Sequence, residues 1–237
     1  MADDVLDRMG LTKFINCQGT STTVCGALVD PRVMEAMAEA AKHYVWLPEL
    51  QKKAGERVAE LCGGEAAFIT SGASAGLFLS TAALLAGTDP QKMRQLPDTT
   101  GMKNEVIVCR AHRNGFDHIL EVAGAKFVEI GLTAHGTFPA DMEMAITENT
   151  AFCFYTPSFL VGWDLDFESF RDIAKAHDLP ILVDFAGAIP PASNLHKYTD
   201  LGAALVVFSG GKGLRGPQGT GLILGRADLI EACAANS

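Results

Sequence analysis

The chain has 237 residues, and 48% of them are apolar, which is enough for one large domain with a substantial core. The formal net charge of −9 argues against a broad nucleic-acid surface, because phosphate neutralisation needs clustered lysines and arginines. No apolar run is long enough to span a membrane, and the acidic residues 1–4 show no signal-peptide pattern. A cytoplasmic protein without a membrane partner is therefore expected.

The expected elements alternate between helices and strands along the chain. Helices are predicted over 31–43, 47–62, 74–86, 116–123, 141–146 and 167–177, and strands over 66–70, 105–109, 125–130, 151–155, 181–184, 203–208 and 220–224. Residues 89–103 are polar and are expected to form a long surface loop. This alternation predicts a three-layer α/β/α fold with a mainly parallel sheet, in which a ligand binds at the carboxyl ends of the strands.

The first notable strand end is the small-residue stretch 70–76, which leads from a strand into a helix. The first amides of a helix are unpaired donors at the positive end of its dipole, so a phosphate could bind here, with Ser71 or Ser74 adding a hydroxyl. An ordinary capped helix is the alternative. The stretch matches neither the P-loop nor the G-x-G-x-x-G pattern.

Two further strand ends carry His112 and Asp184. His112 could present a flat ring to an aromatic cofactor, or it could be a polar loop residue. Asp184 follows an apolar strand, where an unpaired acid is costly to bury, so a cationic partner is expected. A protonated pyridine nitrogen would serve, and so would an Arg or Lys; Ala186 is small enough to lie beneath a ring.

The fourth strand end is the glycine-rich stretch 209–218, which contains Lys212. A lysine at the end of a buried strand can form a Schiff base with a carbonyl, although a solvated lysine in a turn has the same appearance in sequence. Ser209 could give a hydroxyl to a phosphate. A phosphate cradle, a flat ring, a buried acid and a lysine together form the set that pyridoxal phosphate requires.

At this point the chain resembles the fold-type-I pyridoxal phosphate enzymes. Within them it is similar to the group related to bacterial selenocysteine synthase and D-glucosaminate-6-phosphate ammonia-lyase. The resemblance covers nearly the whole chain, and its most specific part is the Ser-Gly-x-Lys core followed by Gly-Pro-Gln. The other stretches that carry it are 15–20, 48–51, 69–73, 111–113 and 183–186.

The resemblance implies a role for each candidate residue. Lys212 would form the Schiff base and move a proton at the substrate Cα, Asp184 would pair with the pyridine nitrogen, and His112 would stack on the ring. The phosphate would be held by Ser71, Gly72, Ala73 and Ser209. Thr20 and Arg215 are substrate-side candidates, and a surface salt bridge is an equal reading of Arg215.

The resemblance also implies a domain organisation. Residues 1–45 would pack on the large domain or on a partner subunit, and 46–237 would form the large pyridoxal-phosphate-binding domain. The small C-terminal domain of the family is expected to be absent. Since each site of this fold is normally completed by a neighbouring subunit, at least a homodimer is expected.

The leading functional hypothesis is an α,β-elimination of ammonia or water from a hydroxylated amino acid or amino-sugar acid. The alternatives are a β-replacement on seryl-tRNA, a racemase or aminotransferase activity, and a truncated chain that binds cofactor or assists assembly without catalysis. No metal site is predicted, because the cysteines and histidines are dispersed and no C-x-x-C pair occurs. The cysteines are expected to be buried free thiols.

Overall fold

A seven-stranded sheet forms the centre of the protein, in the order β1-β7-β6-β5-β4-β2-β3. The structure is a computed structural model that describes residues 4–132, 135–157 and 164–237. β7 pairs antiparallel with both β1 and β6, and the other pairings are parallel, which confirms the predicted mainly parallel α/β sheet. The strands are β1 (Ala66–Thr70), β2 (Glu105–Cys109), β3 (Lys126–Ile130), β4 (Thr150–Tyr155), β5 (Ile181–Asp184), β6 (Leu205–Ser209) and β7 (Gly221–Gly225).

The six predicted helices are present, one with its predicted bounds and five with shifted ends, and α1, α5, α9 and α10 were not predicted. They are α1 (Val5–Arg8), α2 (Pro31–Ala40), α3 (Leu47–Cys62), α4 (Ala73–Ala86), α5 (Pro90–Gln95), α6 (His118–Val122), α7 (Pro139–Ala145), α8 (Phe167–Ala176), α9 (Lys197–Asp200) and α10 (Ala227–Ala235). None of the helices in the described part of the chain combines the length and the apolar character that a membrane crossing requires.

Capping explains where several helices begin and end. The Asp30 carboxylate accepts a hydrogen bond from Arg32 N at 3.0 Å and caps α2, whose first residue is a proline. α3 ends at Gly63, which has a left-handed φ of 67°. The loop predicted over 89–103 is wrong in its first half, because Asp89 caps α5 through Gln91 N and Lys92 N. The sequence reading overlooked this Asp-Pro helix start.

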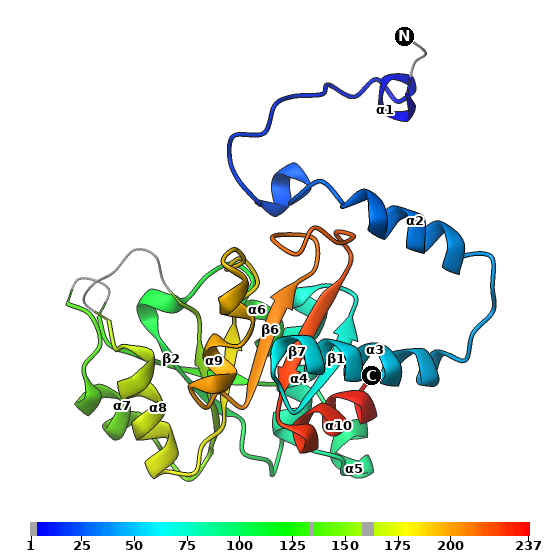
Figure 1. Cartoon of the computed structure of the whole chain (residues 1–237). Coiled ribbons are helices and arrows are strands. Elements are labelled where there is room, and N and C mark those ends of the chain that lie inside the picture. The colour runs from blue at the N-terminus through cyan, green and yellow to red at the C-terminus, as the bar shows by residue number, and fades with distance from the viewer. Residues whose placement is uncertain (1–3, 133–134, 158–163) are drawn as a thin grey trace.

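Alternate residues of the central strands feed two apolar cores, one on each face of the sheet. On β6, Val206 and Phe208 pack in the core that α3, α7, α8 and α9 cover. Leu205 and Val207 of the same strand belong to the opposite core, beneath α4, α6 and α10. Figure 1 shows these helices on the two sides of the sheet. The layers fix the strand ends, and these ends build the site.

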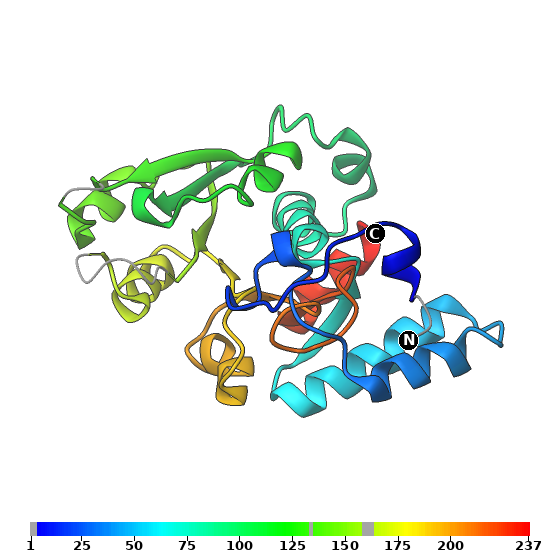
Figure 2. The same cartoon turned by 90° about the horizontal axis from the view of Figure 1, so that it is seen from above.

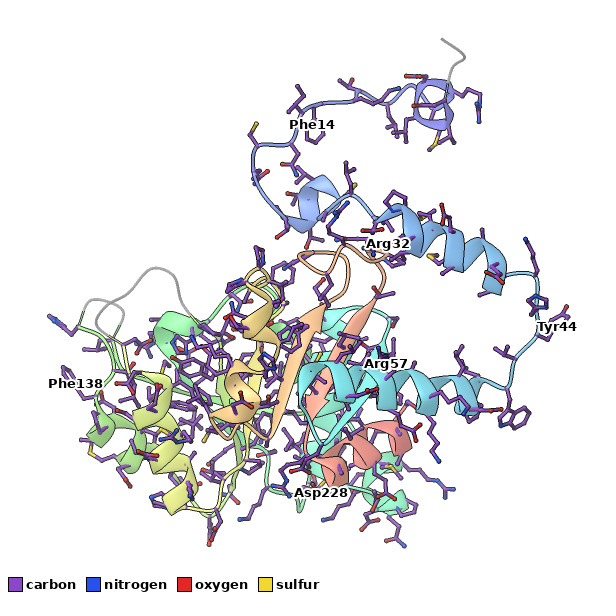
Figure 3. The ribbon with its side chains drawn as sticks, viewed as in Figure 1. Phe14, Arg32, Tyr44, Arg57, Phe138 and Asp228 are labelled. Atoms are coloured by element: carbon purple, nitrogen blue, oxygen red, sulfur yellow. The ribbon has the colours of Figure 1, made fainter. Side chains whose placement is uncertain are left out.

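Residues 4–46, here called the N-terminal arm, extend away from the body of the molecule (Figure 1). Figure 3 shows Phe14 and Tyr44 projecting from the arm without covering side chains from the body. The arm carries many exposed large apolar side chains: Val5, Leu6, Met9, Leu11, Phe14, Ile15, Leu28, Met34, Met37, Tyr44, Val45 and Trp46. Seen from above, the arm crosses over the 210–220 loop (Figure 2).

Candidate cofactor site

A cavity of about 590 Å³ lies at the carboxyl ends of β1, β2, β4, β5 and β6. This is the edge at which parallel α/β sheets bind ligands, and the volume suits a small organic molecule. Each residue predicted to bind the cofactor lines the cavity: Ser71, Gly72, Ala73, His112, Asp184, Ala186, Ser209 and Lys212. The strand ends that carry these separate motifs in the sequence therefore converge on one space.

The amino end of α4 opens onto this cavity. Gly72 is its N-cap, with a φ of 112°, and none of the described side chains caps the helix through a hydrogen bond. Thr70 Oγ1 donates to Gly72 O at 2.8 Å and holds the turn that leads into the helix. Free amides at the positive end of a helix dipole, next to Ser71 and Ser74, suit a phosphate group.

Asp184 is buried at the end of β5, at the cavity wall. Its Oδ1 accepts a hydrogen bond from Ala186 N at 3.0 Å. Burial raises the pKa of this carboxyl, while the Ala186 N–H and the positive charge of Lys212 act in the opposite direction. A cation bound in the cavity would stabilise the ionised form of Asp184.

Lys212 lies in the turn that follows β6, and its side chain lines the cavity. Its Nζ stands 5.7 Å from the centre of the Phe116 ring. A Cβ atom built on Gly187, just beyond β5, would be 3.9 Å from the same Nζ. The lysine is therefore not a solvated surface residue; its amine sits in the cavity close to the strand end that carries Asp184.

The lysine turn is held by its own backbone. Gly210 N donates to Thr220 O and Gly216 N donates to Gly210 O, both at 2.8 Å. Arg215 N donates to Lys212 O at 2.9 Å. Gly213 packs so tightly that an added Cβ would overlap the carbonyl oxygen of Ile189.

We expect Gly213→Ala to lower the free energy of unfolding by about 1–3 kcal/mol, because the new methyl group forces backbone to move. Gly219→Ala is the matched control, since a Cβ at Gly219 would meet nothing within 4 Å. Urea unfolding of the two variants measures the difference. Equal stability of the two variants would show that the turn is loose.

The arm contacts the lysine turn directly. Ala27 N donates to Gly211 O at 2.9 Å, and Asp30 N donates to Arg215 O at 2.9 Å. The Arg215 guanidinium turns toward the arm, where its Nε donates to Leu28 O at 3.3 Å. Arg215 therefore lies outside the cavity and takes the surface alternative foreseen for it.

Thr20, the other substrate-side candidate, is also absent from the cavity lining, whereas Thr22 of the same arm is part of it. Thr22 begins a short 3₁₀ turn, Thr22–Val24, which closes on Cys25 with a left-handed φ of 66°. The sequence motif therefore points to the correct segment and misses the residue that reaches the site.

His112 is buried against the cavity at the end of the 3₁₀ turn Arg110–His112. Its ring meets Tyr155 edge-on, with 4.6 Å between the ring centres. Its Nε2 lies 3.0 Å from Asp164 Oδ2, at ion-pair distance but without the angle of a well-formed hydrogen bond. The Tyr155 contact restrains the ring while the ring lines the cavity.

Arg113 also lines the cavity, but carboxylates already surround its charge. Its Nε lies 2.7 Å from Asp117 Oδ2 and its Nη1 lies 2.6 Å from Glu129 Oε1. The guanidinium also stacks over the Phe127 ring at 4.0 Å. Arg113 thus braces the loop after β2, with its charge largely balanced from within the protein.

Sequence reasoning missed Thr156 and Phe116, which both line the cavity. The Thr156 Oγ1 is buried and has no hydrogen-bond partner among the described residues, so it is available to a ligand. Thr156 directly follows β4, and attention to every strand end would have found it. Phe116 lies in an irregular loop and carries no comparable signal.

The cysteines differ in part from expectation. Cys62, Cys109, Cys153 and Cys233 are buried and free, but Cys17 and Cys25 are exposed on the arm. Potential ligand atoms of Cys109, His112 and Asp164 all lie within 4.8 Å of one another. The sequence does not reveal this cluster, because Asp164 is far along the chain from Cys109 and His112.

The fold and this site define the class: pyridoxal-phosphate-dependent enzymes of fold type I. A lysine after β6, a buried carboxylate after β5 and an uncapped helix start after β1 share one cavity. The family model described as "SelA: L-seryl-tRNA selenium transferase" matches residues 15–237, and the chain belongs to this family.

Curated relatives and solved structures agree with that assignment. The chain is 34% identical to a D-glucosaminate-6-phosphate ammonia lyase of Salmonella typhimurium, over 99% of this chain and 64% of the lyase. It is 32% identical to a 5'-C-glycyluridine monooxygenase-decarboxylase of Streptomyces sp, over 96% of this chain and 57% of that protein. A selenium transferase of Caldanaerobacter subterraneus is 28% identical and is covered over 52% of its length.

A solved structure of D-glucosaminate-6-phosphate ammonia-lyase superposes with a TM-score of 0.93 and 33% identity, covering all of this chain and 64% of that one. A Thermus thermophilus aspartate aminotransferase, at 21% identity and a TM-score of 0.59, shares the fold. The chain thus spans between about half and two thirds of the length of the relatives named here.

Proposed function

We propose that this chain is the cofactor-binding part of a pyridoxal-phosphate-dependent lyase. The reaction is an α,β-elimination that releases ammonia or water from a hydroxylated amino acid or amino-sugar acid. The observation that carries the proposal is the convergence of Lys212, Asp184 and the amino end of α4 on one cavity. The residues fit the cofactor, because the uncapped amino end of α4 suits its phosphate, the buried Asp184 suits a cationic ring nitrogen and the Lys212 amine suits its aldehyde.

When bound, pyridoxal phosphate supplies an aldehyde that reacts with amines and a protonated ring that accepts an electron pair. Lys212, whose amine faces the cavity, would hold the cofactor through its aldehyde carbon and would be the base that takes the proton from the substrate Cα. Asp184 would pair with the ring nitrogen and keep it protonated, since a cation there would offset the burial of the carboxylate.

The remaining side chains orient the cofactor. His112 would stack on its ring, and the small side chain of Ala186 would leave room for that ring. Ser71, Gly72, Ala73 and Ser209 would hold the phosphate near the amino end of α4. Thr20 and Arg215 stay substrate-side proposals, although neither lines the cavity and Arg215 faces the arm.

The ammonia-lyase relative favours elimination, because it is the more similar of the relatives named above and covers almost the whole chain. The Streptomyces relative is nearly as similar and has a different reaction in its name, so similarity alone does not choose the chemistry. The products must therefore be measured directly.

Borohydride reduction of the protein incubated with pyridoxal phosphate, followed by peptide mass mapping, tests the cofactor role. A pyridoxyl adduct is expected on Lys212, and its absence would overturn the enzyme readings in favour of a non-catalytic chain. Incubation with D-amino-sugar acids should then release ammonia and a 2-keto acid. Racemised or transaminated products would replace elimination with those activities.

A second candidate is β-replacement on seryl-tRNA, which the family model favours. The net charge of −9 weighs against it, because tRNA binding relies on basic surface. Retarded migration of seryl-tRNA with steep salt dependence would support this candidate, and no binding at low salt would exclude it.

The partner we propose is a second copy of the chain. The many exposed apolar side chains of the N-terminal arm, which also bonds to the body through Ala27 and Asp30, support our proposal that residues 1–45 pack on the body and on a partner subunit. Sedimentation of the protein should give a dimer or a higher homo-oligomer.

A further inference from the structure

The buried Asp164 carboxylate lies next to His112, the residue that we propose stacks on the cofactor ring. Asp164 Oδ2 lies 3.0 Å from His112 Nε2, and the two side chains are 5% and 2% exposed. An acid and an imidazole this well buried are rarely placed together by chance, because each is costly to bury without a partner.

Asp164 is held from several sides. Its Oδ1 accepts a hydrogen bond from Leu165 N at 3.0 Å. Burial would raise the pKa of Asp164, but the nearby His112 and Thr137 side chains and the Leu165 N–H together outweigh burial and lower it. Asp164 therefore remains ionised at neutral pH and presents an acceptor to the imidazole. The neighbouring Cys109 thiol has its pKa raised by burial and by the Asp164 charge, so it stays protonated.

The imidazole has few other ways to be held. Its Nδ1 is buried and has no hydrogen-bond partner in the described part of the chain. The Tyr155 ring meets it edge-on at 4.6 Å between ring centres, and this contact resists tilting but does not choose a tautomer. The only ring nitrogen with a polar partner among the described residues is Nε2, which faces Asp164.

We propose that Asp164 is a positioning residue that keeps the proton on His112 Nε2 and fixes the imidazole plane against the cofactor ring. The claim about ring orientation against the cofactor rests on the proposed function. The claim about the His112 tautomer concerns the protein alone. At 3.0 Å the Asp164 carboxylate favours a proton on the Nε2 that faces it, with or without a bound cofactor.

Histidine side-chain nitrogen NMR of the cofactor-free protein tests the tautomer. The wild-type protein should show His112 protonated on Nε2, with its signals assigned by their loss in His112→Phe. In Asp164→Ala the same signals should move to the average of the two tautomers. Asp172→Ala, which removes an exposed acid that pairs with Arg171, should leave them unchanged.

Spectrophotometric titration with pyridoxal phosphate tests the positioning role. Asp164→Asn keeps the shape of the side chain and removes its charge, and it should weaken cofactor binding about tenfold. In a His112→Phe background the same substitution should change binding less than about twofold, because a residue that acts through another has no effect once that partner is gone.

Each result has a distinct meaning. Equal losses in the two backgrounds, or an unchanged tautomer in Asp164→Ala, would overturn the proposal. Stoichiometric zinc in the purified protein, lost in Cys109→Ala, would also overturn it, because the metal would take the Nε2 lone pair. If the wild-type protein binds no pyridoxal phosphate, the proposed function fails and the NMR result still decides the tautomer.

Discussion

Replacing Lys212 with alanine is expected to abolish covalent attachment of pyridoxal phosphate and to lower turnover by on the order of 10³-fold or more. The loss is large because one amine has two tasks in the proposed reaction. It anchors the cofactor, and it moves the proton at the substrate Cα. No second lysine lines the cavity within the described residues, so none can substitute.

Borohydride mapping and steady-state assays measure both losses. Lys103→Ala is the control, since Lys103 is exposed in the loop before β2. Its adduct and rate should match those of the wild-type protein. If the Lys212 variant keeps a pyridoxyl adduct on another lysine and turns over normally, the assignment of the site is wrong.

Asp184→Asn should impair cofactor binding and turnover but raise the stability of the cofactor-free protein. These opposite effects make it more informative than the Lys212 variant. It should weaken cofactor binding and slow turnover by about 10²-fold or more, because an amide cannot hold the ring nitrogen protonated. It should also stabilise the cofactor-free protein at neutral pH, because it removes a carboxyl whose burial cost Lys212 offsets only in part.

The stabilisation depends on pH in a defined direction. Burial raises the pKa of Asp184 above its ordinary value of 3.8, so the folded protein binds this proton more tightly than the unfolded chain does. The wild-type protein therefore loses stability as the pH rises from about 3.8 through the raised folded pKa, and the loss is complete above it. Below the unfolded value the acid is neutral in both states, and the asparagine variant has no advantage.

Thermal unfolding of the cofactor-free protein across this range checks the effect. We expect the melting temperature of Asp184→Asn to exceed that of wild type at pH 7, by about 2–4 °C for each kcal/mol gained. Asp200→Asn, at an exposed position on α9, should show no such difference. A melting temperature at pH 7 that is lower than wild type would mean that the Asp184 charge already has a partner within the protein.

The sequence predicts the parts of the site that depend on strand ends. Asp184 and Lys212 each follow a short apolar run. Such a run is typical of a buried strand, so its last residue marks the end of the strand. Because parallel strands end at one edge, the sequence places both residues together, and the structure agrees. The phosphate cradle before α4 is predictable for the same reason.

The parts that depend on loops and on the arm could not be predicted. Arg215 turns away from the cavity because backbone groups of the arm meet the lysine turn, and no local pattern reveals a pairing across such a separation. Asp164 meets His112 through a fold in which the loops after β2 and β4 approach each other. Thr22, the first residue of a 3₁₀ turn in the arm, lines the cavity in place of Thr20, and no local pattern distinguishes the two threonines.

The place of β7 in the sheet has a consequence for biosynthesis. β7 follows the other six strands of this sheet along the chain, yet it lies between β1, which leads into the phosphate cradle, and β6, which leads into the lysine turn. A nascent chain therefore holds both halves of the site before it can align them. Insertion of β7 brings the halves into register, and such long-range pairing is slow. Acquisition of cofactor thus reports the insertion of β7, and a ribosome-bound chain that still lacks residues 221–225 should remain cofactor-free.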